Sequence, residues 1–150
     1  MTTVIDVFDA LETLIEGCLT GYKMLENPII PEDNAKQIYN KSFGIAIAQG
    51  TNPEIFTKAI SSCQRDFNIV LINKVTTTKA QTDRRNDQQK SIMADMDTIK
   101  MCIDSDPALG AICAKASLVS DSGVNFIDAD TGKYYLVEGV ITTLSFSDNI

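Results

Sequence analysis

Two long stretches of alternating residues constrain most strongly what this chain can fold into. They lie at about residues 64–75 and 134–147, and in each of them two sets of side chains alternate with a period of two residues. That period is typical of a β-strand, and the half-polar alternation of the first stretch indicates an antiparallel strand with one face partly wet. The chain is therefore expected to contain a sheet built on two long strands.

A third alternating stretch, at about residues 37–48, separates large side chains from small ones. Small side chains allow close approach, so either a helix or a neighbouring subunit is expected to pack on the small face. The large set points one way and the small set the other: Phe43, Ile45 and Ile47 against Gly44, Ala46 and Ala48.

Two amphipathic helices are predicted from apolar residues that recur every three or four positions, at roughly residues 3–20 and 83–103. The first two turns of the second helix carry no apolar residue, which predicts that they project into solvent or lie against a polar surface. Residues 54–60 are expected to form one or two helical turns. The predicted buried stripe of the second helix is Ile92, Met96, Ile99 and Ile103.

The end of the chain is predicted to be a three-stranded meander, with short strands at about residues 114–120 and 124–128 before the long last strand. The turns at residues 121–123 and 130–132 have good hairpin chemistry. The order of elements predicts a single α+β domain spanning residues 1–150. Its expected architecture is a mixed, mainly antiparallel β-sheet with two main helices packed on one face.

Composition excludes several classes of function. The chain of 150 residues has no histidine, so it lacks the commonest general base and metal ligand and every Ser-His or Cys-His nucleophile pair. Its net charge of -7 argues against a dedicated nucleic-acid binder. No apolar run is long enough to span a bilayer, and the N-terminal residues do not resemble a signal peptide. An intracellular product without a membrane segment is expected.

The four cysteines, at positions 18, 63, 102 and 113, show no zinc-binding spacing. Cys18 and Cys102 fall on the apolar faces of the predicted helices, where a thiol behaves as a small hydrophobic group. All four are expected to be reduced and structural, with a disulfide between distant positions as the lesser alternative.

Charge is unevenly distributed along the chain. Residues 1–35 carry a net charge of -6, residues 36–90 carry +5 and residues 91–150 carry -6. The basic middle is either chance scatter on a solvated surface or a contact patch for an acidic partner or DNA backbone. Two cations in the first turn of a helix oppose its dipole, which tilts the interpretation towards a partner surface. The predicted interaction residues are Lys74, Lys79, Arg84, Arg85 and Lys90.

The tripeptide Asp130-Thr131-Gly132 matches the short signature of aspartic proteases, which need two such loops so that two carboxylates share a proton. Asp128 and Ala129 precede it and Lys133 follows it, which departs from the protease pattern and suits an ordinary hairpin turn. No phosphate-binding glycine motif occurs. We therefore expect a protein that is not an enzyme, with no catalytic residues, no cofactor and no metal site.

The chain resembles the tail terminator (tail completion) proteins of long-tailed bacteriophages in the order and texture of its elements. The resemblance covers most of the chain and rests on pattern. It consists of a helix beginning almost at Met1, a proline-containing segment at 27–33, strands at 43–48 and 65–71, a helix whose apolar stripe begins late at 92–103, and a meander from 120–126 into 139–146. One departure is the hydrophilic connection at 76–89, which is long for a strand-to-helix link.

The resemblance implies a virion structural protein of the neck or tail, assembled in the host cytoplasm. Such a protein forms a homo-oligomeric, six-fold ring that caps the tail tube, ends tube polymerisation and allows joining to the head connector. Its implied partners are itself, the tail tube protein and the head-completion or connector protein, with DNA passing through the ring without sequence-specific binding. The alternatives are another neck or tail ring component, or a small ligand-binding or regulatory α+β module.

Overall fold

The computed structural model of the chain describes residues 3–24, 41–50, 54–55, 60–75, 85–129 and 132–148. It has an α+β fold in which two helices pack against a seven-stranded sheet, and all but one of the strand pairs are antiparallel. The elements, in chain order, are α1 (Val4–Cys18), β1 (Lys23–Met24), β2 (Lys41–Gly50), β3 (Glu54–Ile55), β4 (Ile60–Lys74), α2 (Arg85–Ser105), β5 (Lys115–Asp121), β6 (Asn125–Ala129) and β7 (Gly132–Asp148).

The centre of the sheet is the pairing of its two longest strands, β4 and β7. Their register runs without interruption from Ile60 opposite Asp148 to Lys74 opposite Tyr134. The strand order is β1-β2-β4-β7-β5, while β3 pairs with β4 and β6 pairs with β7. The two stretches whose alternation predicted long strands are thus hydrogen-bonded to each other, and both strands are longer than their patterns indicated.

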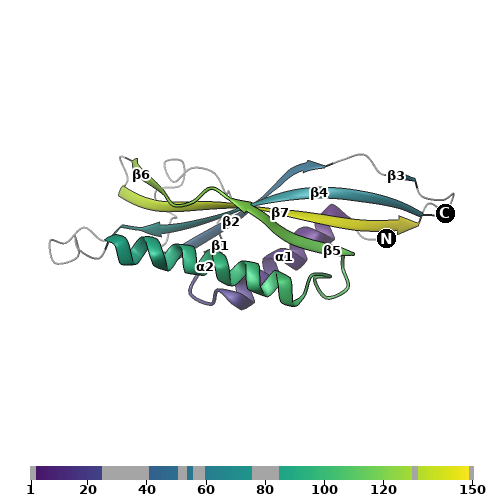
Figure 1. Cartoon of the computed structure of the whole chain (residues 1–150), viewed down its shortest axis with the longest axis horizontal. Coiled ribbons are helices and arrows are strands. Elements are labelled where there is room, and N and C mark those ends of the chain that lie inside the picture. Colours follow the sequence, from purple (N-terminus) through teal and green to yellow (C-terminus); the bar gives the residue numbers. More distant parts are fainter. Residues whose placement is uncertain are drawn as a thin grey trace.

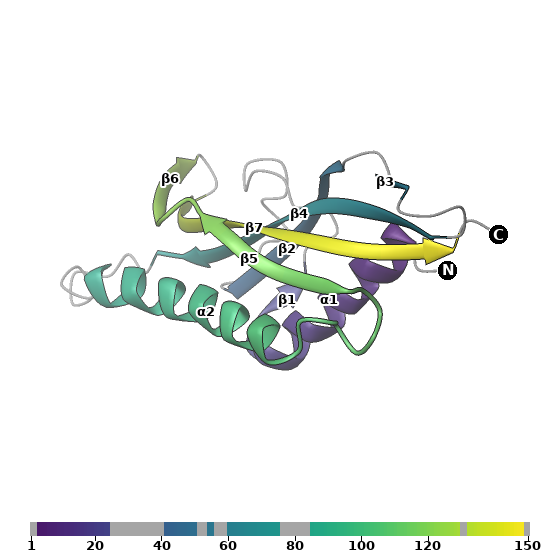
Figure 2. The same ribbon diagram turned by 45° about the vertical axis from the view of Figure 1, so that its right-hand side comes forward.

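Both helices cover the same face of the sheet, as predicted (Figures 1 and 2). The main core lies between the helices and this face, where Phe67, Ile69 and Leu71 of β4 are fully buried. The predicted stripe of α2 is buried, and its first turns are exposed from Asp87 to Ser91 except for half-buried Gln88. The buried residues of the two helices are Val7, Leu11 and Ile15 in α1 and Ile92, Met96, Ile99 and Ile103 in α2.

Helix α1 begins with a capping box. The Oγ1 of Thr3 accepts a hydrogen bond from the Asp6 N–H, and the Asp6 carboxylate accepts one of 2.8 Å from the Thr3 N–H. These bonds satisfy donors that a helix start otherwise leaves unpaired. The bond from the Thr3 backbone is the main reason that the pKa of Asp6 is lowered.

The expectation that all four cysteines are reduced is wrong, because Cys18 and Cys102 form a disulfide between α1 and α2. The two residues are 84 positions apart, and packing of the helices brings their Cα atoms to 6.7 Å. The apolar positions of the two thiols suggested burial, but they carried no information about which helix faces which. Cys63 and Cys113 are free thiols.

Two further expectations need correction. Residues 54–55 form strand β3 and residue 60 begins β4, so the predicted helical turn is wrong at the described positions, and residues 56–59 lie outside them. The helices pack on the large face of β2, through Phe43 and Ile45, and not on its small face. Burial of these large side chains stabilises more than close approach to small ones, since it removes more apolar area from water.

Two strands leave an edge of the sheet open among the residues that the structure describes. Strand β1 pairs with β2 only at Ser42 and Phe43, so the outer edge of β2 has no described partner beyond them. Strand β5 pairs with β7 on one side and with no described strand on the other. These two open edges lie at opposite sides of the sheet.

Candidate interaction surface

Four exposed lysines from four different elements lie at one end of the sheet. Lys41 begins β2 and is paired with Asn73, the neighbour of Lys74 at the end of β4. Lys74 is paired with Tyr134, the neighbour of Lys133. Strand β4 ends, β7 begins and α2 begins at this same end, and Lys90 lies in the exposed first turns of α2 (Figure 1). We call Lys41, Lys74, Lys90 and Lys133 the basic end.

None of the four lysines of the basic end makes an ion pair with a residue whose side chain the structure describes, and the register places Asp128 of β6 directly opposite Lys133. The ion pair found among the described side chains joins Lys100 and Asp104, 2.9 Å apart, near the other end of α2. Asp87, in the first turn of α2, and the half-buried Asp95 are the described helix carboxylates nearest in sequence to Lys90. Among the side chains that the structure describes, the four ammonium groups of the basic end are therefore not neutralised by ion pairs.

A buried tyrosine ties the basic end to the helical layer. Tyr22 is 7% exposed, and its Oη donates a 2.6 Å hydrogen bond to Oδ2 of Asp95 in α2. The Nζ of Lys41 lies 5.7 Å from the centre of the Tyr22 ring, within reach of a cation–π contact. Burial, and then the bond to Asp95, raise the pKa of Tyr22 well above its ordinary value. The arrangement positions Lys41 and holds α2 at this end.

Three carboxylates toward the opposite end of the molecule, where α1 begins and α2 ends, have local partners (Figure 1). The carboxylate of Asp6 accepts the Thr3 N–H, Asp104 pairs with Lys100, and Oδ1 of Asp106 accepts the Gly110 N–H at 3.1 Å. These three carboxylates thus differ from the lysines of the basic end, which have no ion pair among the side chains that the structure describes.

Of the residues predicted from the sequence to form an interaction surface, the structure brings Lys74 and Lys90 to the same end. Lys74 lies on the face opposite the helices, because its partner Tyr134 packs there with Val70 and Ile72. Arg85 begins α2, and the remaining two predicted residues, Lys79 and Arg84, lie outside the described residues.

Lys41 and Lys133 were missed by the sequence interpretation. They lie 33 and 59 positions from Lys74, outside any charged run, and only the strand register brings them beside it. The usable signal was that a lysine stands near the beginning of each of two predicted strands. That signal becomes informative only when the pairing of those strands is known.

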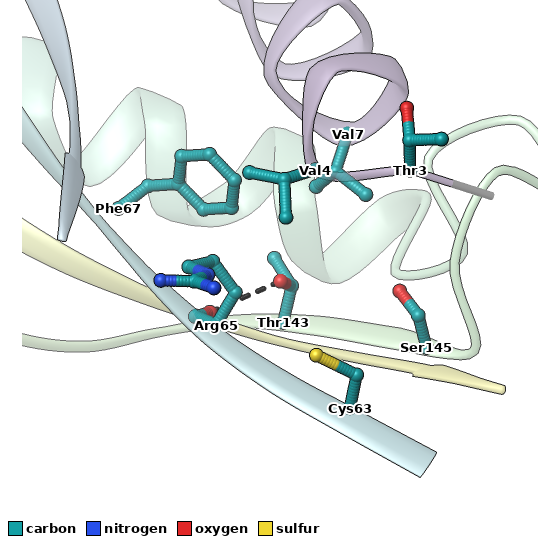
Figure 3. Close-up of a pocket in the computed structure, with 8 residues that line it drawn as sticks. All are labelled: Thr3, Val4, Val7, Cys63, Arg65, Phe67, Thr143 and Ser145. Atoms are coloured by element: carbon teal, nitrogen blue, oxygen red, sulfur yellow. Dashed lines mark hydrogen bonds between the residues drawn. The ribbon is translucent and has the colours of Figure 1, made fainter. Parts of the chain in front are cut away.

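A small cavity lies between the start of α1 and strands β4 and β7 (Figure 3). Its volume is about 30 Å³, whereas pockets for organic ligands measure roughly 300 Å³ or more. Val4 and Val7 face Arg65 and Thr143 across it, with Cys63 at one side (Figure 3). The cavity can hold water but not an organic substrate.

Arg65 is the polar group in this cavity whose hydrogen bonding is incomplete. Its Nη1 donates to the Ala48 carbonyl at 3.0 Å, while its Nε is buried with no hydrogen-bond partner. The guanidinium group lies against Gly50, where an added Cβ atom would collide with its Cζ. The Thr143 hydroxyl donates to the Arg65 carbonyl, so the backbone of Arg65 is fixed as well. A water molecule would complete the hydrogen bonding of Nε.

The described residues offer no further candidate for a metal site. No group of three histidine, cysteine, aspartate or glutamate side chains there could hold a metal ion. Asp130, the residue of the aspartic-protease alternative, lies outside the described residues. In the same part of the chain, no helix combines the length and the apolar character that crossing a membrane requires.

Comparison with known proteins gave no match: no protein-family model fits the chain, and no curated protein matches its sequence.

Proposed function

We propose that this chain is a virion structural protein of the phage neck or tail. In this proposal it forms a ring, hexameric as in the family it resembles, that caps the tail tube, ends tube polymerisation and allows joining to the head connector. The observation that carries the proposal is that β2 and β5, at opposite sides of one sheet, each have an edge without a partner strand among the described residues.

Each open edge exposes one large apolar side chain. Ile47 of β2 is 52% exposed and Val119 of β5 is 58% exposed. An unpaired strand edge presents a row of backbone donors and acceptors, and proteins normally cover such an edge or place charges on it. Exposed apolar residues on both edges favour a partner strand at each.

Two unlike edges favour a ring over a symmetric dimer. A contact between β2 of one copy and β5 of the next is heterologous, because it joins two different surfaces. Such a contact closes into a ring when the rotation that relates neighbouring subunits is a whole-number fraction of 360°. Backbone hydrogen bonds of an added strand supply affinity, and the side chains beside them supply specificity. No described helix covers the small face of β2, where Ala46 and Ala48 are half-buried, and a neighbouring subunit could pack there.

The ligand-binding alternative draws little support from the cavity beside Arg65, because about 30 Å³ does not hold an organic molecule. A different ring component of the neck or tail would use the same open edges. A terminator ring stops the growth of a tail tube, and another neck or tail ring does not. The effect of the protein on a growing tube therefore distinguishes the two functions.

The edge contact is tested by charge introduced at either edge. Ile47→Lys and Val119→Lys should each leave the circular-dichroism spectrum unchanged and convert rings to monomers, because a buried unpaired ammonium group opposes association. Size-exclusion chromatography with light scattering measures the change. Ile5→Lys is the matched control, since Ile5 is 66% exposed on α1, away from both edges. Monomeric wild-type protein that forms no ring even on isolated tails would contradict the proposal.

The terminator role is tested by adding the purified protein to tail tubes that are still polymerising. We expect tube growth to stop at the length present when the protein is added, and the Val119→Lys variant to have no such effect. Electron microscopy of tube lengths measures both results. Rings that form normally while the tubes continue to grow would assign the chain to another neck or tail component.

A further inference from the structure

The ring proposal leaves the two ends of the sheet for other partners. Neighbouring subunits occupy the β2 and β5 edges, so the ends of the long strands lie at the two opposite faces of the ring. The lysines of the basic end then repeat around one face, with four from each subunit.

The charge on the basic end favours binding of an acidic partner. Its four ammonium groups lie on neighbouring strands and on the first turns of α2, without ion pairs among the described residues. Like charges on neighbouring strands repel, and a partner of opposite sign relieves that repulsion and speeds encounter. Three carboxylates of the opposite end already have partners, which makes that end of a second copy a weaker match.

We propose that the basic end is the face through which the ring docks onto an acidic surface of a different protein, a coaxial ring in the neck or tail. This inference rests on the proposed function. A protein fits better than nucleic acid, because duplex DNA carries more negative charge per unit length than an acidic peptide and is repelled more strongly by a chain of net charge -7. The ammonium groups also lack the planar fork with which arginine binds phosphate in two-point contacts.

The surface is tested with two probes of matched length, a poly-glutamate peptide and a double-stranded DNA oligonucleotide. Wild-type protein should bind the peptide at low salt and lose affinity as salt is added, and should bind it more tightly than the DNA. Lys74→Glu and Lys133→Glu should each weaken peptide binding by about fivefold, since each removes one attraction and adds one repulsion. Fluorescence anisotropy measures the affinities.

Lys100→Glu is the matched control, because it makes the same charge change on α2 at a distance from the basic end. It should weaken binding much less than Lys74→Glu. Equal losses in the two variants would overturn the localised surface, and tighter binding of DNA than of peptide would assign the surface to nucleic acid. Salt-sensitive self-association that Lys74→Glu abolishes would instead identify a second copy as the occupant.

The result separates the two proposals. Rings that cap tubes while Lys74→Glu leaves peptide binding unchanged would overturn the docking face and leave the terminator function standing. A monomer that still binds the peptide through Lys74 and Lys133 would support the surface and contradict the ring.

Discussion

Tyr22 and Asp95, 73 positions apart in the sequence, are joined by a 2.6 Å hydrogen bond from the phenol to the carboxylate. Tyr22 lies between the end of α1 and the start of β1, and Asp95 lies in α2. The bond therefore connects the α1–β1 link to α2, although strands β1 to β4 separate them in the sequence. It links the packing of α2 to the geometry of the basic end, because Lys41 rests near the Tyr22 ring.

Removing the Tyr22 hydroxyl should destabilise the fold. We expect Tyr22→Phe to lower the free energy of unfolding by about 1.5 kcal/mol, the lower end of the range for hydrogen bonds to charged groups. The lower end applies because Asp95 is half-buried, so water can replace part of the lost bond. Urea unfolding of Tyr22→Phe, Asp95→Ala and the double variant measures the coupling between the two residues. Strictly additive effects would show that the bond does not contribute.

Alkaline pH should also weaken the fold through Tyr22. The pKa of Tyr22 is raised in the folded state by burial and by Asp95, whereas in the unfolded chain it lies near 10. Above about pH 10 the unfolded chain loses this proton and the folded chain keeps it, so the stability contributed by Tyr22 is present below that pH and declines above it. Unfolding midpoints measured from pH 8 to 11 should fall less steeply in Tyr22→Phe than in the wild type. Parallel curves would contradict this assignment.

Reduction of the Cys18–Cys102 disulfide should lower stability substantially. The bond closes a loop of 84 positions, and loss of that constraint on the unfolded chain costs about 4.5 kcal/mol in the chain-entropy treatment. Urea unfolding with and without a reductant measures the loss. In the double variant Cys18→Ala and Cys102→Ala the reductant should have no effect, which provides the control. An equal effect of reductant on both proteins would point to Cys63 or Cys113.

Gly139 should resist substitution where Gly17 does not. A Cβ atom at Gly139 would stand 2.9 Å from Leu118 Cδ1 and 3.1 Å from Met96 Sδ, between β7, β5 and α2. Gly139→Ala should therefore cost about 1 kcal/mol, as overpacking of a filled core does. Gly17 in α1 has nothing within 4 Å of the same position, and Gly17→Ala should stabilise by about 0.5 kcal/mol through helix propensity. Thermal melts compare the two variants.

The predicted elements agree with the structure where a long periodic pattern was decisive. The stripe of α2, Ile92 to Ile103, is buried as expected, and the segments whose alternation predicted strands, 64–75 and 134–147, lie in β4 and β7. Short segments were less predictable. Residues 54–55 belong to the sheet because they pair with Ser61 and Ser62, and no local sequence pattern predicts that pairing. In the same way, two of the four lysines of the basic end were found from the sequence and two were not.

The sequence by itself determined the kinds and order of the long elements, the apolar sides of both helices and the absence of histidine chemistry, because each of these depends on residues close together in the chain or on composition. Only the tertiary structure decided which side of β2 the helices cover, that Cys18 meets Cys102, and that Lys41 and Lys133 stand beside Lys74. These relationships join residues tens of positions apart, and the free energy that selects them comes from burial and strand pairing across the whole sheet.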